Sequence, residues 1–424
     1  MSIATGLATR ARSAVGLSSV AVLDPARPKR TSPDIHLLRV AACAVVGLAP
    51  VEGYLIDVQP DLAKLPAVVF VVAWLIVRVH VKAIGRLHAA QVVLAGLAAV
   101  ILASYAVHLE EPYAGEYVQR WLPFLVLSAL LVDVIGREVP MRAVLASAVA
   151  GATWAAIGAL QSVLVDGETR ASGPLDDPND LACVLVTALP LLLALIPPPR
   201  PGRRVHPMAL VALVVAAVLA IGAAVTLSRG AGFALAAAVV YLAVRRAVPV
   251  RVMVGAGVLV ALGAALLVVL APETVDRAIG EKVHIAGENI DTRELRWQAA
   301  ARMLAENPVL GVGPGGFRSE YAAASGVAEL AEQTPVAHSM YLEVAAEFGV
   351  PGLVLFLAFI ACGFVASERA LRIGADRQLV LASQAALVAV LVASIFLSEQ
   401  YYLSMWALVA AMCGLELRMR RDGR

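Results

Sequence analysis

Long uninterrupted apolar runs recur along the chain and are separated by short polar stretches, as in ALVALVVAAVLAIGAAV and VMVGAGVLVALGAALLVVL. The apolar positions in these runs are continuous, whereas the strands of a membrane barrel alternate apolar and polar positions. In lipid, a segment satisfies its own backbone polar groups by forming a helix. The pattern therefore predicts membrane-spanning helices.

We expect an all-α integral membrane protein of about twelve transmembrane helices, with one long periplasmic loop between helices nine and ten. The predicted spans are residues 36–52, 66–80, 88–108, 119–135, 142–164, 181–197, 207–226, 231–245, 251–271, 341–366, 377–397 and 400–416. Composition agrees, since 60% of the residues are hydrophobic and 16% are charged. A soluble protein has a larger charged fraction, about 25%.

The spans divide the chain into consecutive parts. Residues 1–35 are polar, basic and rich in Ser and Ala, and are expected to form a disordered cytoplasmic tail. Helices one to nine occupy residues 36–271, the long loop 272–340, helices ten to twelve 341–416, and a basic cytoplasmic tail 417–424.

Lys and Arg are concentrated in alternate loops, which sets the expected orientation. Both tails and every second loop are rich in basic residues, whereas the short loops on the other side carry only Lys64, Arg120, Arg170 and Arg229. Because basic loops stay inside, both termini are expected to be cytoplasmic and the long loop periplasmic, in the inner membrane of a bacterium.

The long loop contains an amphipathic helical pattern, DTRELRWQAAARMLAE, followed by the Gly-rich turn GVGPGGF. Asp291 and Glu294 have the spacing of a capping box, and the helix is expected to end at Asn307–Pro308. Arg293 and Arg296 lie one turn apart and can face the same side. A solvated charged face is the ordinary explanation for such a pair. Trp297 beside them suits a helix at the membrane interface.

Arg229 lies in TLSRGAG, a turn from which the eighth predicted helix begins. The first turn of a helix exposes unpaired N–H groups and the positive end of the dipole. Ser228 is expected to cap this helix, and Gly230 lets an anion approach the backbone. A guanidinium suits phosphate oxygens, which predicts a phosphate site. The alternative is an arginine that anchors the helix to lipid headgroups.

His338 stands where the tenth predicted span begins, in PVAHSMYLEVAAEFGVPG. A histidine can take a proton from a hydroxyl group, although a helix-entry residue without a catalytic role is the alternative. Glu343 and Glu347 lie four residues apart inside the apolar run. Carboxylates within a span usually face a cavity or a partner, because burying them in lipid is costly.

The DDPND stretch before the sixth span could suggest a divalent metal, but a Pro-containing turn before the helix is the preferred interpretation. No metal or other cofactor is expected.

Four motifs follow one another in this order: R-x2-GPLDDPNDLA, TLSRGAGFALA, TRELRW with NPVLGVGPGGF, and AHSMYLEVAAEFGVPGL. Together with the spans and the long loop, they resemble the O-antigen ligase and Wzy-type polysaccharide polymerase superfamily. One departure is Ser339, where relatives commonly have Asn after the histidine.

The resemblance implies a metal-independent membrane glycosyltransferase that takes a glycan from undecaprenyl pyrophosphate and joins it to an acceptor at the periplasmic face. It implies catalytic roles for Arg229, Arg293 and His338, with the arginines on the donor pyrophosphate and the histidine on the acceptor hydroxyl. The expected donor- or acceptor-binding residues are Arg170, Asn179, Ser228, Arg296, Tyr341 and Glu343.

The expected partners are the lipid-linked donor, a glycan or lipid A-core acceptor, the bilayer, a flippase and a chain-length regulator, and not nucleic acid. A polymerase of surface polysaccharide or exopolysaccharide is favoured, and an O-antigen ligase, which acts in lipopolysaccharide assembly, is next. The alternative class is a polytopic transporter or a lipid-linked oligosaccharide flippase. Such proteins place polar residues near mid-membrane, whereas here the unusual polar residues concentrate at the outer edge.

Overall fold

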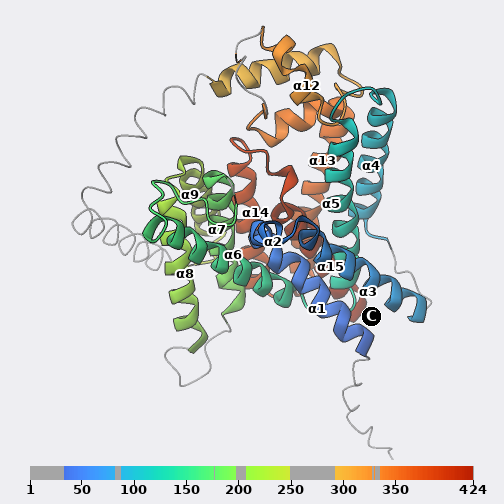
Figure 1. The fold of residues 1–424 in the computed structure, drawn as a ribbon. Coiled ribbons are helices and arrows are strands. Elements are labelled where there is room, and N and C mark those ends of the chain that lie inside the picture. Colours follow the sequence, from blue (N-terminus) through green and yellow to red (C-terminus); the bar gives the residue numbers. More distant parts are fainter. Residues whose placement is uncertain are drawn as a thin grey trace, which may run out of the picture.

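The computed structural model of the protein describes residues 33–81, 87–175, 177–196, 207–248, 292–326, 329 and 335–423. In these ranges the chain forms helices joined by turns and contains no strand (Figure 1). The predicted ninth span, residues 251–271, and Asp291 of the predicted capping box lie outside the described residues.

The helices follow one another along the chain as the hydropathy pattern predicts. They are α1 (Pro33–Leu48), α2 (Glu52–Val58), α3 (Leu65–Val81), α4 (Ala89–Val107), α5 (Ala114–Ile135), α6 (Met141–Leu164), α7 (Pro178–Leu195), α8 (Pro207–Val225), α9 (Arg229–Val244), a helix over residues 292–306, α12 (Gly316–Ala324), α13 (Met340–Arg372), α14 (Arg377–Ala393) and α15 (Leu403–Asp422). Short 3-10 turns occur at Ala49–Val51, Pro60–Lys64 and Glu399–Tyr401.

Each predicted span within the described residues coincides with a helix, and eight helical stretches are long and apolar enough to cross a membrane. Over its described residues the chain is therefore all-helical and has the spans of a polytopic membrane protein, while the total of twelve spans and the position of the long loop stay predictions. α9 and α14 are apolar but shorter. Near the C-terminus the boundaries differ from those predicted: α14 already ends at Ala393, and α15 continues through Asp422.

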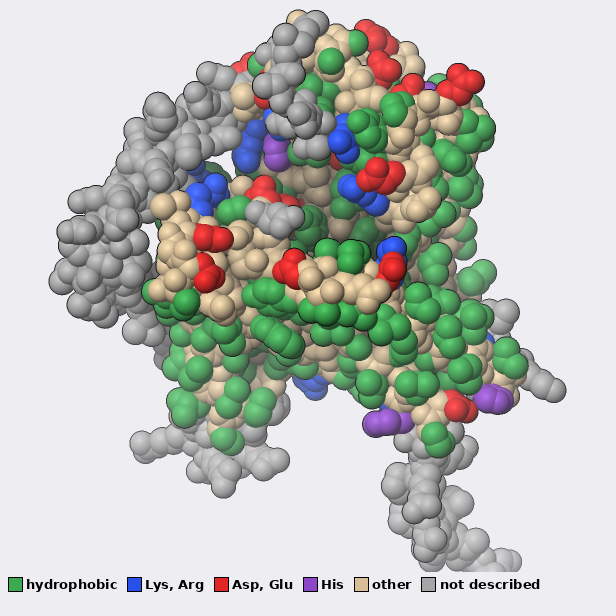
Figure 2. All heavy atoms as spheres, in the orientation of Figure 1, with side chains coloured by type: hydrophobic (Ala, Val, Ile, Leu, Met, Phe, Trp, Pro, Cys, Tyr) green, Lys and Arg blue, Asp and Glu red, His purple; other side chains and the backbone are tan. Residues whose placement is uncertain are grey.

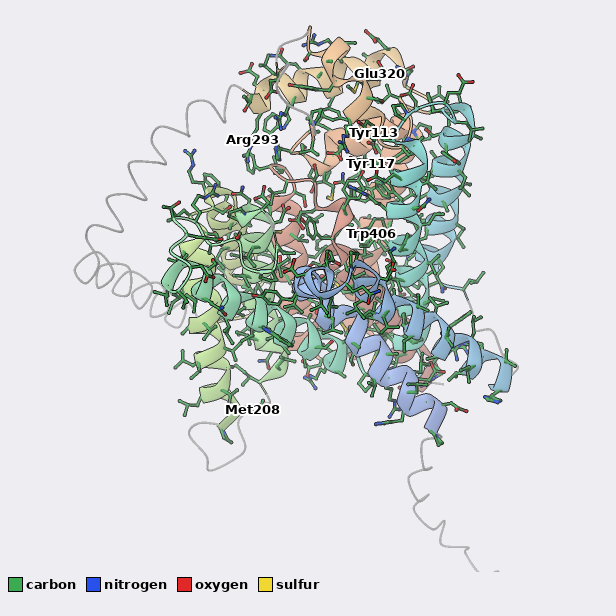
Figure 3. All side chains as sticks on the ribbon, in the orientation of Figure 1. Tyr113, Tyr117, Met208, Arg293, Glu320 and Trp406 are labelled. Carbon is green, nitrogen blue, oxygen red and sulfur yellow. The ribbon has the colours of Figure 1, made fainter. Side chains whose placement is uncertain are left out.

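The bundle is held together by apolar packing among helices that are distant in sequence. α14 packs against α7 and α9, and α15 packs against α5 and α13. Trp121 of α5 is fully buried among aromatic rings, with Phe348 and Trp406 edge-on at centroid distances of 5.1 and 6.0 Å. Such pairs contribute about 0.5–1.5 kcal/mol each beyond the area they bury. Figure 3 shows Trp406 near the middle of the bundle.

α13 is broken at Gly349, whose φ of 66° lies in the left-handed region. A Cβ at this position would lie 2.6 Å from the carbonyl oxygen of Pro308, so glycine is required both by the backbone conformation and by the close approach. The freed amide of Val350 donates to that same carbonyl at 2.8 Å. The helix is thus interrupted where the segment around Pro308 packs on it.

The Gly-rich turn packs directly on the first half of α13. The amides of Val312 and Gly313 donate to the carbonyls of Ala346 and Glu347 at 2.9 and 3.1 Å. These bonds place α12 and the 292–306 helix as a layer over one end of the bundle, at the top of Figure 1. Two of the sequence motifs, GVGPGGF and EFGVPG, therefore pack against each other. The end of the bundle that this layer covers is the α12 end.

Candidate functional site

The molecule is hollowed at the α12 end. Figure 2 shows the hollow between the layer that carries α12 and the helix bundle beneath it, with Lys or Arg side chains and a histidine on its margins.

Arg229 is the first residue of α9 and is exposed. Ser228 is the N-cap, and its hydroxyl accepts a hydrogen bond from the amide of Ala231 at 3.4 Å, which confirms the predicted cap. The tight turn before it places Leu227 at a φ of 55°. The guanidinium of Arg229 therefore lies beside the N-terminus of a helix, where backbone N–H groups and the helix dipole favour an anion.

Arg293 lies in the first turn of the 292–306 helix and points from the upper layer toward the side of the molecule that carries α9 (Figure 3). Burial lowers the pKa of its guanidinium, and the positive charges of Arg229, Arg296 and Arg170 lower it further, while Asp177 raises it. Four arginines from three separate segments, the loop after α6, the start of α9 and the 292–306 helix, thus act electrostatically on this region. Glu329 neutralises Arg296, and Asp177 supplies one negative charge against Arg170, Arg229 and Arg293. The positive charge that remains suits an anionic ligand.

Arg170 ties the loop after α6 to the end of α8 and to α7. Its Nε donates to the carbonyl of Thr226 at 3.2 Å, and its Nη2 lies 3.4 Å from Oδ1 of Asn179. Asn179 in turn donates from its backbone N and from Nδ2 to Oδ1 of Asp177, at 2.6 and 2.9 Å.

Asp177 is the N-cap of α7. The DPND part of the stretch therefore makes a capping turn, as the preferred interpretation predicted. Within the described ranges, no group of three or more His, Cys, Asp or Glu side chains is arranged to hold a metal ion.

Arg296 is buried and forms a bidentate ion pair with Glu329, at 3.1 Å from Nε and 3.0 Å from Nη2. Its guanidinium lies 6.0 Å from the ring centre of Tyr321, whose hydroxyl also donates to Glu329. The hydrogen bond from Arg296 lowers the pKa of Glu329, and the charge of His338 acts in the same direction. Arg296 is therefore held by Glu329, although it lies only one turn from Arg293.

Acidification is expected to loosen the segment held by Glu329. A carboxyl group whose pKa is depressed in the folded protein contributes stability above its unfolded pKa of about 4.3, and this is lost as the pH falls through the folded value. The signal to follow is the fluorescence of Trp297 from pH 7 to 3, obtained by difference with Trp297→Phe. Glu329→Gln should remove the acid transition, and an identical transition in that variant would contradict the assignment.

His338 is half-buried, with a φ of 47°, and precedes Ser339, the N-cap of α13. Hydrogen bonds fix the turn on both sides of it. The amide of Ala337 donates to Oε2 of Glu343 at 3.2 Å, and the amide of Met340 donates to the carbonyls of Ser394 and Leu397 at 3.0 and 2.8 Å. Ser339 makes no side-chain capping bond. The carbonyls of Ser394 and Leu397 instead accept from the first amide of the helix, that of Met340.

The remaining predicted residues lie on the first turns of α13. The hydroxyl of Tyr341 donates to the carbonyl of Leu391 at 2.7 Å. Glu343 is buried, and its carboxylate accepts from Ala337, Ser398 and Gln400. Glu347, one turn on, is buried against the Gly-rich turn, where the amides of Gly315 and Phe317 approach its carboxylate.

The connection between α14 and α15, residues 394–402, was not singled out from the sequence, yet it touches most of these elements. The ring of Phe396 pairs with the rings of Phe233 and Trp297 at centroid distances of 6.5 and 6.2 Å. The hydroxyl of Tyr402 donates to Asp180 of α7 at 2.6 Å. The polar residues 398–400, Ser-Glu-Gln, interrupt the apolar sequence there and could have marked this connection as a candidate.

This arrangement can bind and stabilise an anion at a membrane surface. Guanidinium groups and a helix N-terminus neutralise phosphate oxygens, and a histidine at the margin of the same hollow can exchange a proton with a hydroxyl group.

Residues 214–357 match the family described as O-antigen ligase, which corresponds to about a third of the chain. No curated protein matches the chain. The matched segment contains the turn with Arg229, the 292–306 helix, the Gly-rich turn and the start of α13, while the motif around Arg170 lies before it. Residues 214–357 are therefore similar to the O-antigen ligase family, in agreement with the resemblance seen in the sequence motifs.

Proposed function

We propose that the protein transfers glycan units from undecaprenyl pyrophosphate to an acceptor hydroxyl at the periplasmic face of the bacterial inner membrane. The α12 end would be the periplasmic end, and both termini would be cytoplasmic. The observation that carries the proposal is the exposed guanidinium of Arg229 beside the N-terminus of α9, close enough to Arg293 to lower the pKa of that second guanidinium.

In the proposed reaction the bond between the anomeric carbon and the pyrophosphate oxygen breaks, and a bond from the acceptor oxygen to that carbon forms. His338 takes the hydroxyl proton, and undecaprenyl pyrophosphate leaves with its electron pair. Arg229 and Arg293 stabilise the charge that develops on the leaving group, which is where preorganised donors contribute most to rate. Asn179, Ser228 and Tyr341 are proposed to line the donor and acceptor sites, and no metal enters the reaction.

Arg170 and Arg296 are proposed to support this anion site through the side chains that they already hold. Arg170 links the α7 cap to the end of α8, and Arg296 holds Glu329. We favour a polymerase of surface polysaccharide or exopolysaccharide, and an O-antigen ligase is the second candidate. A flippase that delivers the donor and a chain-length regulator are the expected partners.

The deciding experiment is deletion of the gene, followed by gel analysis of cell-surface polysaccharide after complementation. The complementing proteins are the parent chain, Arg229→Ala, Arg293→Ala and His338→Ala, each expressed at the parent level. Arg302→Ala is the matched control, because Arg302 is an exposed arginine on the same helix as Arg293.

Loss of long chains, with single repeat units still attached to the surface, would identify a polymerase. Loss of all attached glycan, with long carrier-linked chains accumulating, would identify a ligase. If the three substituted proteins complement as fully as the control, the proposed site is wrong, and the transporter or flippase class becomes the better explanation.

A further inference from the structure

The turn that carries His338 is held by a carboxylate, and that carboxylate belongs to Glu343. Its Oε2 accepts from the amide of Ala337 at 3.2 Å and from the hydroxyl of Ser398 at 2.5 Å, and its Oε1 accepts from Nε2 of Gln400 at 2.8 Å. Both oxygens are therefore engaged by protein donors, and the side chain is 2% exposed. A substrate has no free access to this group.

We infer that Glu343 is a positioning residue, which fixes the His338 turn against the connection between α14 and α15 instead of binding donor or acceptor. This inference rests on the proposed function, because it concerns the presentation of His338 to an acceptor hydroxyl.

The backbone at His338 explains why such a restraint is needed. A φ of 47° is unfavourable for a non-glycine residue, so it persists only where the surroundings fix it. The amide just before His338 is held by Glu343, and the second amide after it is held by the carbonyls of Ser394 and Leu397. Ser398 and Gln400 follow these carbonyls closely in the chain. The 394–402 connection thus holds the histidine turn directly through its backbone and indirectly through Glu343.

Glu347 provides a contrast on the same helix. It is as deeply buried as Glu343 and lies one turn further along α13, but its carboxylate faces the amides of Gly315 and Phe317 in the Gly-rich turn. The hydroxyl of Tyr401 also donates to Glu347 at 3.5 Å. Loss of Glu347 should disturb the packing of the Gly-rich turn and this contact, but it leaves in place the bonds from Ala337, Ser398 and Gln400 to Glu343. It is therefore a matched control for the removal of a buried carboxylate.

The test is a double-mutant cycle on the purified full-length protein. Turnover is measured as release of undecaprenyl pyrophosphate by mass spectrometry, with saturating lipid-linked glycan extracted from the deletion strain. Glu343→Ala is expected to lower turnover roughly 10- to 100-fold, since misplacing a reacting group by about 1 Å has effects of that size. In the His338→Ala background the same substitution should change turnover less than about twofold, because no placed histidine remains to be lost.

Glu347→Ala is expected to lower turnover by the same factor in both backgrounds. Glu343→Gln serves as the conservative variant and keeps the test open if Glu343→Ala fails to fold. The Oε1 atom of Gln400 has no hydrogen-bond partner within the described part of the chain, so this amide can turn and accept from the new glutamine. Glu343→Gln should therefore retain most of the parent turnover.

An equal loss from Glu343→Ala in both backgrounds would overturn the positioning role and leave a purely structural one. Parent-like turnover of Glu343→Ala beside a slow His338→Ala would overturn this inference alone. Parent-like turnover of His338→Ala would instead overturn the role of His338 in the proposed function, and the inference with it.

Discussion

Replacing Arg229 with alanine is expected to lower glycan transfer by about 10²–10³, the usual effect of removing one preorganised stabiliser of developing charge. Arg229 lies beside the N-terminus of α9 and contributes to the field on Arg293. Arg229→Lys should recover only part of the rate, because an ammonium keeps the charge but lacks the planar fork that binds two phosphate oxygens. The measurement is turnover of lipid-linked donor by the purified protein, with Arg302→Ala as the control.

The arginine assignment also makes a binding prediction. Arg229→Ala and Arg293→Ala should both weaken the binding of inorganic pyrophosphate to the purified protein, measured by competition against the lipid-linked donor. If Arg229→Ala binds pyrophosphate as tightly as Arg302→Ala and turns over at the parent rate, Arg229 is an anchor to lipid headgroups and the anion site is misassigned.

Replacing His338 with alanine is expected to lower turnover by roughly 10²–10⁴, the range observed for loss of a general base. Donor binding should hardly change, because the groups assigned to the pyrophosphate are the arginines. The measurement therefore compares turnover at saturating donor with pyrophosphate competition in the same preparation. His36→Ala, which changes an exposed histidine on α1, is the control. Weakened pyrophosphate binding with unchanged turnover would show that His338 belongs to the donor site.

Much of the helical framework could be predicted because a membrane helix depends on a local property, a continuous apolar run. The cap by Ser228, the helix end before Asn307–Pro308 and the turn in the DDPND stretch were also predictable from neighbouring residues. The end of α14 was not. Hydropathy extends that helix to residue 397, but the carbonyls of Ser394 and Leu397 accept from Met340 in the structure. A contact between distant segments overrides the local pattern there.

In the candidate site, too, features set by local sequence were predictable and contacts between distant segments were not. Resemblance singled out Arg229, Arg293 and His338, and the arginines do share one electrostatic environment. The sequence could not reveal that Arg296 is engaged by Glu329, since the partner lies 33 residues away in a stretch whose sequence has no periodic pattern. It also gave no reason to connect Glu343 with Ser398 and Gln400, because that contact depends on how α14 and α15 meet α13.

The contact between the Gly-rich turn and the break at Gly349 has a consequence for chimeric enzymes. A graft that exchanges the outer segment of this protein for that of a relative must carry residues 307–317 together with the first half of α13. The carbonyl of Pro308 and the amide of Val350 form one joint across the two pieces. A graft cut within residues 318–339 would take Pro308 from one parent and Val350 from the other. The grafted segment is therefore expected to pack correctly on α13 only when both sides of this contact come from one parent.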